Sequence, residues 1–181
     1  MVSPLLAQLV GVLSKRCSEP LRLVRSGASQ VRSNAKPKAG SAPEPSYFVP
    51  NILRPAKVFL DGSGKVLPAD QRQSLVQSLF EDLAGKYEAA LAKMKKDGDA
   101  LRRLKRGRQG TGFSSLFGRG SAAAASSADD AAGPSAEDER VRAQMATDVE
   151  TFAKDAQSLG VDLGDSQALK ALRAVVEDWN K

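Results

Sequence analysis

The feature that most constrains the fold of this chain is a stripe of apolar residues at helical spacing through its middle third. The stripe advances by steps of four, four, four, four, three, seven and three residues, through Leu75, Leu79, Leu83, Tyr87, Leu91, Met94, Leu101 and Leu104. Steps of three and four place side chains on one face of an α-helix, so the spacing predicts an amphipathic helix of about ten turns. Pro68 is expected near its first turn, and Gly107 and Gly110 are expected to end it. Gly98 is expected to loosen the helix locally.

The region before this helix predicts shorter helical pieces. Residues 4–33 read as two helices separated at Pro20, a residue that suits the first turn of a helix. Their apolar stripes are Leu5, Leu6, Leu9, Val12 and Leu13, and then Leu21, Val24, Ala28 and Val31. Residues 46–60 predict an extended stretch followed by a short helix that begins with a proline.

The last part of the chain predicts a second helical pair. Residues 137–159 begin with three acids, which suit a helix N-terminus, and carry an apolar stripe up to Gly160. Asp165 or Ser166 is expected to cap a final helix, with Trp179 as a packing residue near the end. No stretch shows the alternation of a half-buried strand. The predicted fold class is therefore all-α, a helical bundle or rod segment.

Composition divides the chain into segments. Residues rich in Gly, Ser and Ala between the two helical regions predict a disordered loop, and a Lys/Pro/Gly/Ser-rich stretch predicts a linker. The expected segments are an amphipathic helical part (1–35), a linker (36–46), a region with the long helix (47–106), the flexible loop (107–136) and the C-terminal helical pair (137–181).

The sequence contains few side chains that could carry out catalysis or bind a metal ion. The 181 residues include no His and a single Cys, Cys17, which excludes a disulfide, a Cys/His zinc site and a His-based catalytic dyad within one chain. Asp148, Glu150 and Asp155 are interpreted as surface charges on the polar side of their helix. The glycines after residue 106 lack the Gly-Lys-Ser/Thr ending of a phosphate loop. We expect no cofactor, no metal and no enzyme activity.

The sharpest charge feature is the run LRRLKRGR at residues 101–108. Its bases are Arg102, Arg103, Lys105, Arg106 and Arg108. They could bind an acidic partner or an anionic membrane surface, or they could simply be a solvated helix end that complements the negative end of the helix dipole. Nucleic acid is disfavoured, because no aromatic residue interleaves the bases. Charge is also distributed unevenly along the whole chain, since residues 120–181 hold 12 acids and 6 bases, and the first 119 residues hold 21 bases and 9 acids.

The N-terminal segment allows two interpretations. Residues 14–33 are rich in Arg and Ser with one acid, Glu19, as in a mitochondrial transit peptide. The alternative function is accordingly a small basic mitochondrial matrix protein, associated with the ribosome. No apolar run reaches the roughly 20 residues that cross a bilayer. The other interpretation is a retained structural helix.

Three blocks in order resemble one family. They are PSYFVPNILRPAKVFL at residues 45–60, KYEAALAKMKKDGDALRRLKRGRQGT at 86–111, and EDERVRAQMATDVETFAKDAQSLGVD at 137–162. Together with LSKRCSEPLRLVRSGASQVR, within residues 9–33, they resemble the C-terminal region of subunit 2 of the conserved oligomeric Golgi complex. The resemblance favours a retained N-terminal helix. Members of that family are several times longer, with an N-terminal coiled-coil part, so a fragment or a short form is expected.

The resemblance implies a function. The complex is a peripheral tether on the cytosolic face of the Golgi membrane that captures vesicles in intra-Golgi retrograde transport and maintains Golgi organisation. It implies the other subunits of the complex as partners, with fusion proteins, coat proteins and small GTPases as further candidates. Such a subunit works through helix-mediated protein contacts and needs no catalysis.

Overall fold

The described structure is helical throughout. The computed structural model describes residues 4–33, 44–109, 136–164 and 166–180, and these contain no strand, which confirms the all-α prediction. The elements are α1 (Pro4–Cys17), η1 (Glu19–Leu23), α2 (Val24–Ser33), α3 (Val49–Ile52), α4 (Arg54–Asp61), η2 (Ser63–Val66), α5 (Ala69–Gln109), α6 (Ala136–Ser158), α7 (Gln167–Glu177) and η4 (Asp178–Asn180). Of the predicted disordered loop, 107–136, residues 107–109 belong to α5 and Ala136 begins α6, which corrects its ends, and residues 110–135 lie outside the described ones.

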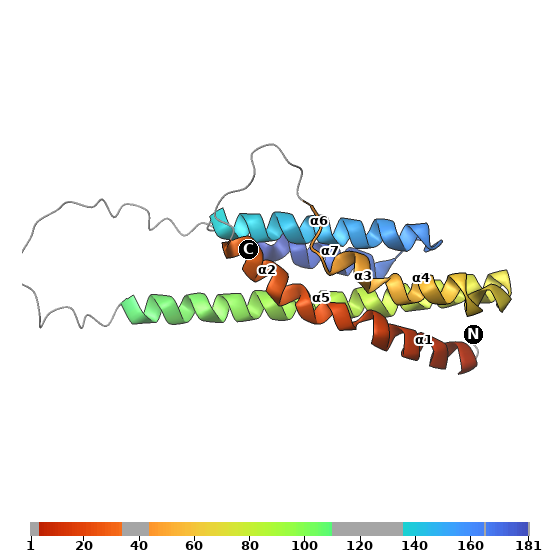
Figure 1. Ribbon diagram of the computed structural model, residues 1–181. Helices are drawn as coiled ribbons and strands as arrows, with labels where there is room; N and C mark the ends of the chain where they lie inside the picture. Colours follow the sequence, from red (N-terminus) through yellow and green to blue (C-terminus); the bar gives the residue numbers. More distant parts are fainter. Residues whose placement is uncertain (1–3, 34–43, 110–135, 165, 181) are drawn as a thin grey trace, which may run out of the picture.

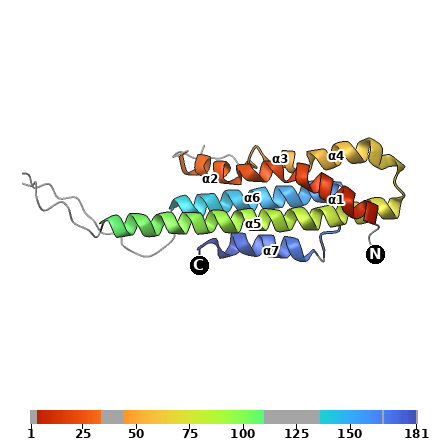
Figure 2. The same cartoon turned by 90° about the horizontal axis from the view of Figure 1, so that it is seen from below.

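The helix α5 is the spine of an elongated bundle (Figures 1 and 2). Helix α7 packs along α5 and α6, α1 packs along α5, and α2 and α3 pack against α6. Helix α6 runs antiparallel to α5, since Phe152 stacks on Phe80 and the backbone at Asp162 meets Gln77, near the start of α5. Each helix buries one stripe, and the buried stripes join in a single core.

The predicted stripe of α5 is buried along most of its length but not at its end. The core side chains are Leu75, Leu79, Leu83, Tyr87, Leu91 and Met94, whereas Leu104 is 69% exposed. The helix also runs without interruption through Gly98 and Gly107 to Gln109, so the prediction that Gly107 ends it was wrong, whereas a local loosening at Gly98 stays a prediction. The last turns of α5 extend past the neighbouring helices (Figure 2), and Leu104 has no core to enter there.

The N-terminal prediction is confirmed in outline and corrected in detail. A 3-10 turn with Pro20 in its first turn separates α1 from α2. Leu6 and Leu13 are buried, but Leu5 and Val12 are 76% and 55% exposed. Helix α1 packs mainly on α5 and α4 at the edge of the bundle, so only part of its apolar stripe finds a neighbour.

Two further segments show how local signals set helix boundaries. The segment predicted to be extended before a single short helix instead forms two helices, α3 and α4, each with a proline in its first turn. Gly160 has the positive φ of 89° that favours glycine at the end of α6. The hydroxyl of Ser166 accepts a hydrogen bond from the amide of Leu169 and caps α7, as predicted.

Four of the chain's nine aromatic rings meet in the centre of the core. Phe80 and Phe152 stack at 5.4 Å between ring centroids, and Tyr87 meets Phe152 edge to face at 5.7 Å. Phe48 meets Tyr87 edge to face at 6.4 Å. Although aromatics are only 5% of the sequence, they join α3, α5 and α6 at one level of the bundle.

Candidate functional site

The predicted basic residues lie on a part of α5 that leaves the bundle. We call residues 99–109 the basic tip. Before the tip, α5 is held to its neighbours by the ion pair between Arg25 and Asp97, 3.5 Å apart, and by a hydrogen bond from Lys95 to the carbonyl of Asp178. Beyond them the ribbon of α5 continues past the ends of α2 and α6 (Figure 1). Eleven residues at 1.5 Å each extend about 16 Å.

The structure places all five predicted bases on this one helical segment. They are Arg102, Arg103, Lys105, Arg106 and Arg108. Arg103 is exposed, as is its apolar neighbour Leu104. The other four side chains lie outside those that the structure describes. The backbone carries the run as one uninterrupted helix up to Gln109.

The same end of the bundle carries opposite charge on its body. Helix α6 begins there with Glu137, Asp138 and Glu139 (Figure 1). Of these three acids, Asp138 is buried, with 5% of its surface exposed.

A buried carboxylate, Asp148, corrects the prediction of a surface charge. Its side chain is 0% exposed. It accepts hydrogen bonds from the amide of Ser46 (2.7 Å), the hydroxyl of Ser46 (2.7 Å) and the side-chain amide of Gln144 (3.0 Å). Burial raises the pKa of Asp148 above its ordinary 3.8, although these hydrogen bonds oppose the shift. The carboxylate thus fastens the segment before α3 to α6.

Sequence spacing held a signal for this site. Asp148 lies three residues after Met145 and four before Phe152, which puts it on the apolar face of α6. The other two acids of the group behave as predicted. Glu150 is exposed and pairs with Arg173 through two hydrogen bonds of 2.8 and 3.0 Å, and Asp155 is partly exposed. None of the three forms a carboxylate pair suited to acid–base chemistry.

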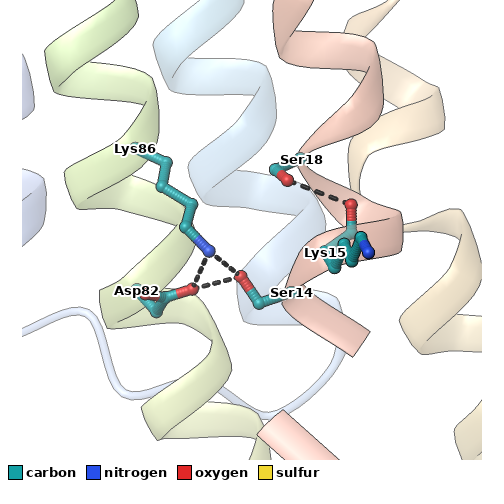
Figure 3. A network of polar contacts seen from close by, with 5 residues as sticks. All are labelled: Ser14, Lys15, Ser18, Asp82 and Lys86. Atoms are coloured by element: carbon teal, nitrogen blue, oxygen red, sulfur yellow. Dashed lines mark hydrogen bonds and ion pairs between the residues drawn. The ribbon is translucent and has the colours of Figure 1, made fainter. Parts of the chain in front are cut away.

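A second polar cluster joins α1 to α5 (Figure 3). The hydroxyl of Ser14 donates to Asp82, and the ammonium of Lys86 donates to both Ser14 and Asp82, 2.8 Å from the latter. Burial raises the pKa of Asp82, but the hydrogen bonds from Lys86 and Ser14 and the charge of Lys86 outweigh it and hold the pKa below 3.8. An ion-paired ammonium has no lone pair to accept the Ser14 proton, so this arrangement does not activate a nucleophile.

Two reactive groups are enclosed in the core. Burial raises the pKa of the Cys17 thiol to about 11, and the thiol is fully shielded. Burial and the nearby charge of Asp148 also raise the pKa of Tyr87. Its hydroxyl has no hydrogen-bond partner in the structure. Neither group is accessible to a substrate.

Other surface features are modest. The exposed large apolar side chains are Leu5, Leu23, Tyr47, Val12, Val58, Val66 and Leu104. A shallow polar hollow lies between the start of α5 and the turn before α7, with Gln73, Gln77 and Asp162 among its lining residues. Among the described residues, no three His, Cys, Asp or Glu side chains are grouped so that they could hold a metal ion. No helix within the described ranges is both long and apolar enough to cross a membrane.

Comparison with known proteins identifies the family of this chain. No solved structure matches this chain. The sequence model of the family described as "COG complex component, COG2, C-terminal" matches residues 1–149, from the N-terminal segment through the first half of α6. The match includes the stretch that composition alone also allowed as a transit peptide, and it does not support the mitochondrial alternative. The chain belongs to this family, the C-terminal part of a subunit of the oligomeric complex that tethers vesicles at the Golgi.

Proposed function

We propose that this chain acts without catalysis, through helix-mediated protein contacts, in intra-Golgi retrograde transport and in maintaining Golgi organisation. The observation that carries the proposal is the family match over residues 1–149, which spans α1 to α5 and much of α6. The enclosed Cys17 and the ion-paired Lys86 are consistent with a scaffold, since neither is available for chemistry.

The proposed contact surface is the outer side of α1. Leu5 and Val12 lie on it with Leu9 partly buried beside them, at spacings of four and three residues. Such a stripe suits packing against an amphipathic helix. The last turn of α1 carries the bases Lys15 and Arg16, and the helix contains no acid. We propose sister subunits of the complex as the first partners, and fusion proteins, coat proteins and small GTPases as further ones, on the cytosolic face of the Golgi membrane.

We also propose the division of the chain. The segments 1–35, 47–106 and 137–181 supply the bundle, with a linker at 36–46 and a tolerant loop at 107–136. What supports the division is the position of the described helices, although α5 continues to Gln109 and α6 begins at Ala136, both within the segment proposed as the loop.

Affinity purification of the tagged chain from its own cells tests the proposal. We expect subunits of the Golgi tethering complex in the eluate, an intact N-terminus by mass spectrometry, and overlap with Golgi markers by microscopy. Replacing Leu5 and Val12 with Ser should reduce the recovery of partners, and replacing Val58 and Val66, which are also exposed, is the matched control. Recovery of mitochondrial proteins with a shortened N-terminus would refute the proposal.

A further inference from the structure

Helix α1 carries two apolar stripes that differ by one residue in register. Each stripe advances by steps of four and three residues and holds two leucines and one valine. The outer stripe is Leu5, Leu9 and Val12, and the inner stripe is Leu6, Val10 and Leu13. Leu6 and Leu13 are buried against the bundle, whereas Leu5 and Val12 are exposed. Because the two stripes have the same composition, apolar burial alone does not decide which of them faces the bundle.

A polar cluster distinguishes the two rotations of the helix. Ser14 is 1% exposed and lies toward α5. Its hydroxyl donates to the carboxylate of Asp82 and accepts from the ammonium of Lys86 at 2.5 Å (Figure 3). Successive residues of an α-helix are about 100° apart. Turning α1 by one position would therefore put Leu13 in the place of Ser14, and Leu13 offers the ion pair of Asp82 and Lys86 no hydrogen bond.

The end of α1 distinguishes the same two rotations. Arg16 continues the outer stripe, four residues after Val12, and is exposed. Cys17 occupies the corresponding position of the inner stripe and is fully enclosed in the core. The same turn of α1 would move Arg16 into the place of Cys17. Enclosing a guanidinium in an apolar environment is far more costly than enclosing a neutral thiol.

We propose that Ser14 and Arg16 are positioning residues that select which apolar stripe of α1 faces the bundle. A polar group in a helix–helix interface can fix its register at some cost in stability. Ser14 acts through hydrogen bonds that only the observed rotation permits, and Arg16 acts through a charge that only this rotation keeps in water. The inference deepens the proposed function and rests on it, since it explains why the outer stripe is the one left for a partner.

Labelling of Cys17 with a maleimide in the folded 181-residue chain tests the inference. Cys17 is the single cysteine, and it is enclosed in the observed rotation. Turning α1 would move it to the place of Ser18, which is partly exposed. The double substitution Ser14→Ala/Arg16→Ala removes both selecting groups. Labelling should then become about tenfold faster, the change in population that the loss of one hydrogen bond to a charged group supports. Each single substitution should raise the rate less than the double one.

The matched control is Lys15→Ala/Ser18→Ala, which also removes one base and one serine hydroxyl from this end of α1. Lys15 is exposed, and the hydroxyl of Ser18 donates to the carbonyl of Lys15 at 3.0 Å instead of reaching α5 (Figure 3). The control should be labelled at the rate of the unaltered chain. Equal labelling rates in the two double variants would overturn the inference.

Amide hydrogen exchange separates a turned helix from an unfolded one. A turned α1 keeps its backbone hydrogen bonds, whereas a detached segment of 14 residues would not remain a stable helix. The amides of residues 4–17 should therefore be as protected in Ser14→Ala/Arg16→Ala as in the unaltered chain. Fast labelling accompanied by loss of this protection would mean that α1 unfolds, and it would overturn the inference.

Purification of the same variants separates this inference from the proposed function. Ser14→Ala/Arg16→Ala should recover fewer subunits of the tethering complex, and the control should recover as many as the unaltered chain. Faster labelling with full recovery would support the positioning role and refute α1 as the contact surface. If the unaltered chain recovers no tethering subunit, the proposed function fails, and the labelling result still decides whether Ser14 and Arg16 position α1.

Discussion

The buried carboxylate of Asp148 gives the sharpest test of how this bundle is held together. Replacing Asp148 with Ala leaves the amide and the hydroxyl of Ser46 without their acceptor, while Gln144 keeps the carbonyl of Glu44 at 2.8 Å. A hydrogen bond to a charged group contributes about 1.5–3 kcal/mol. The lower end applies here, because burial of the charge itself costs stability. Two such bonds amount to about 3 kcal/mol, a fall of about 6–12 °C in Tm for a chain of this size.

The assay is chemical and thermal unfolding followed by circular dichroism, with Glu150→Ala as the control on the same helix. Glu150 and Arg173 are about half exposed, so their ion pair is screened and its loss should cost at most about 1 kcal/mol. If Asp148→Ala were no more destabilising than Glu150→Ala, the reasoning about the buried network would be refuted.

The pH dependence of the same site has a definite sign. The folded-state pKa of Asp148 lies above its ordinary 3.8, so folding favours the protonated form. Its contribution to stability is therefore fully present below pH 3.8 and is lost as pH rises through the raised pKa. Measured against Asp148→Asn, which does not titrate, the unaltered protein should lose stability over that rise. A relative gain would contradict the assignment.

Three further predictions concern the core and the loop. Leu83→Asp buries an unpaired carboxylate at a fully enclosed position and should lower the free energy of unfolding by several kcal/mol. Leu104→Asp, on the basic tip, is the control and should leave thermal unfolding nearly unchanged. Equal effects of the two substitutions would show that the two positions share one environment. Cys17, whose thiol pKa is about 11, should resist thiol reagents at pH 8 until the protein is unfolded, and rapid labelling of the folded chain would contradict its burial. Deleting residues 118–134 should preserve helix content and Tm, and a large loss of either would show that this segment packs on the bundle.

Much of the fold was predictable because its signals are local. The long stripe from Leu75 to Met94 required a helix with one buried face, and that face is buried. Pro20 required a break, and the break is there. Ser166 caps the start of α7, and Gly160 follows the end of α6 with a positive φ. Each of them acts only on residues close to it in the sequence. Such signals depend on backbone geometry and short-range hydrogen bonds, which the sequence specifies directly.

The candidate site was only half predictable. The sequence alone located the basic run at residues 101–108. Its separation from the bundle depends on where α2, α6 and α7 end relative to α5 (Figure 2), and no pattern within the run encodes that. The same holds for Leu5 and Val12, which share a stripe with buried residues but lie where α1 has no neighbour.

The sequence by itself determined that this protein is all-α, where its principal helices lie, and which face of each is apolar. Only the tertiary structure decided which parts of those faces are covered. Asp148 shows the reason most clearly, since its hydrogen-bond partner Ser46 lies 102 residues away along the chain. A carboxylate can be buried on the apolar face of a helix only when a hydrogen-bond donor from elsewhere in the chain reaches it. A buried charge needs more hydrogen bonds than its own helix alone can supply.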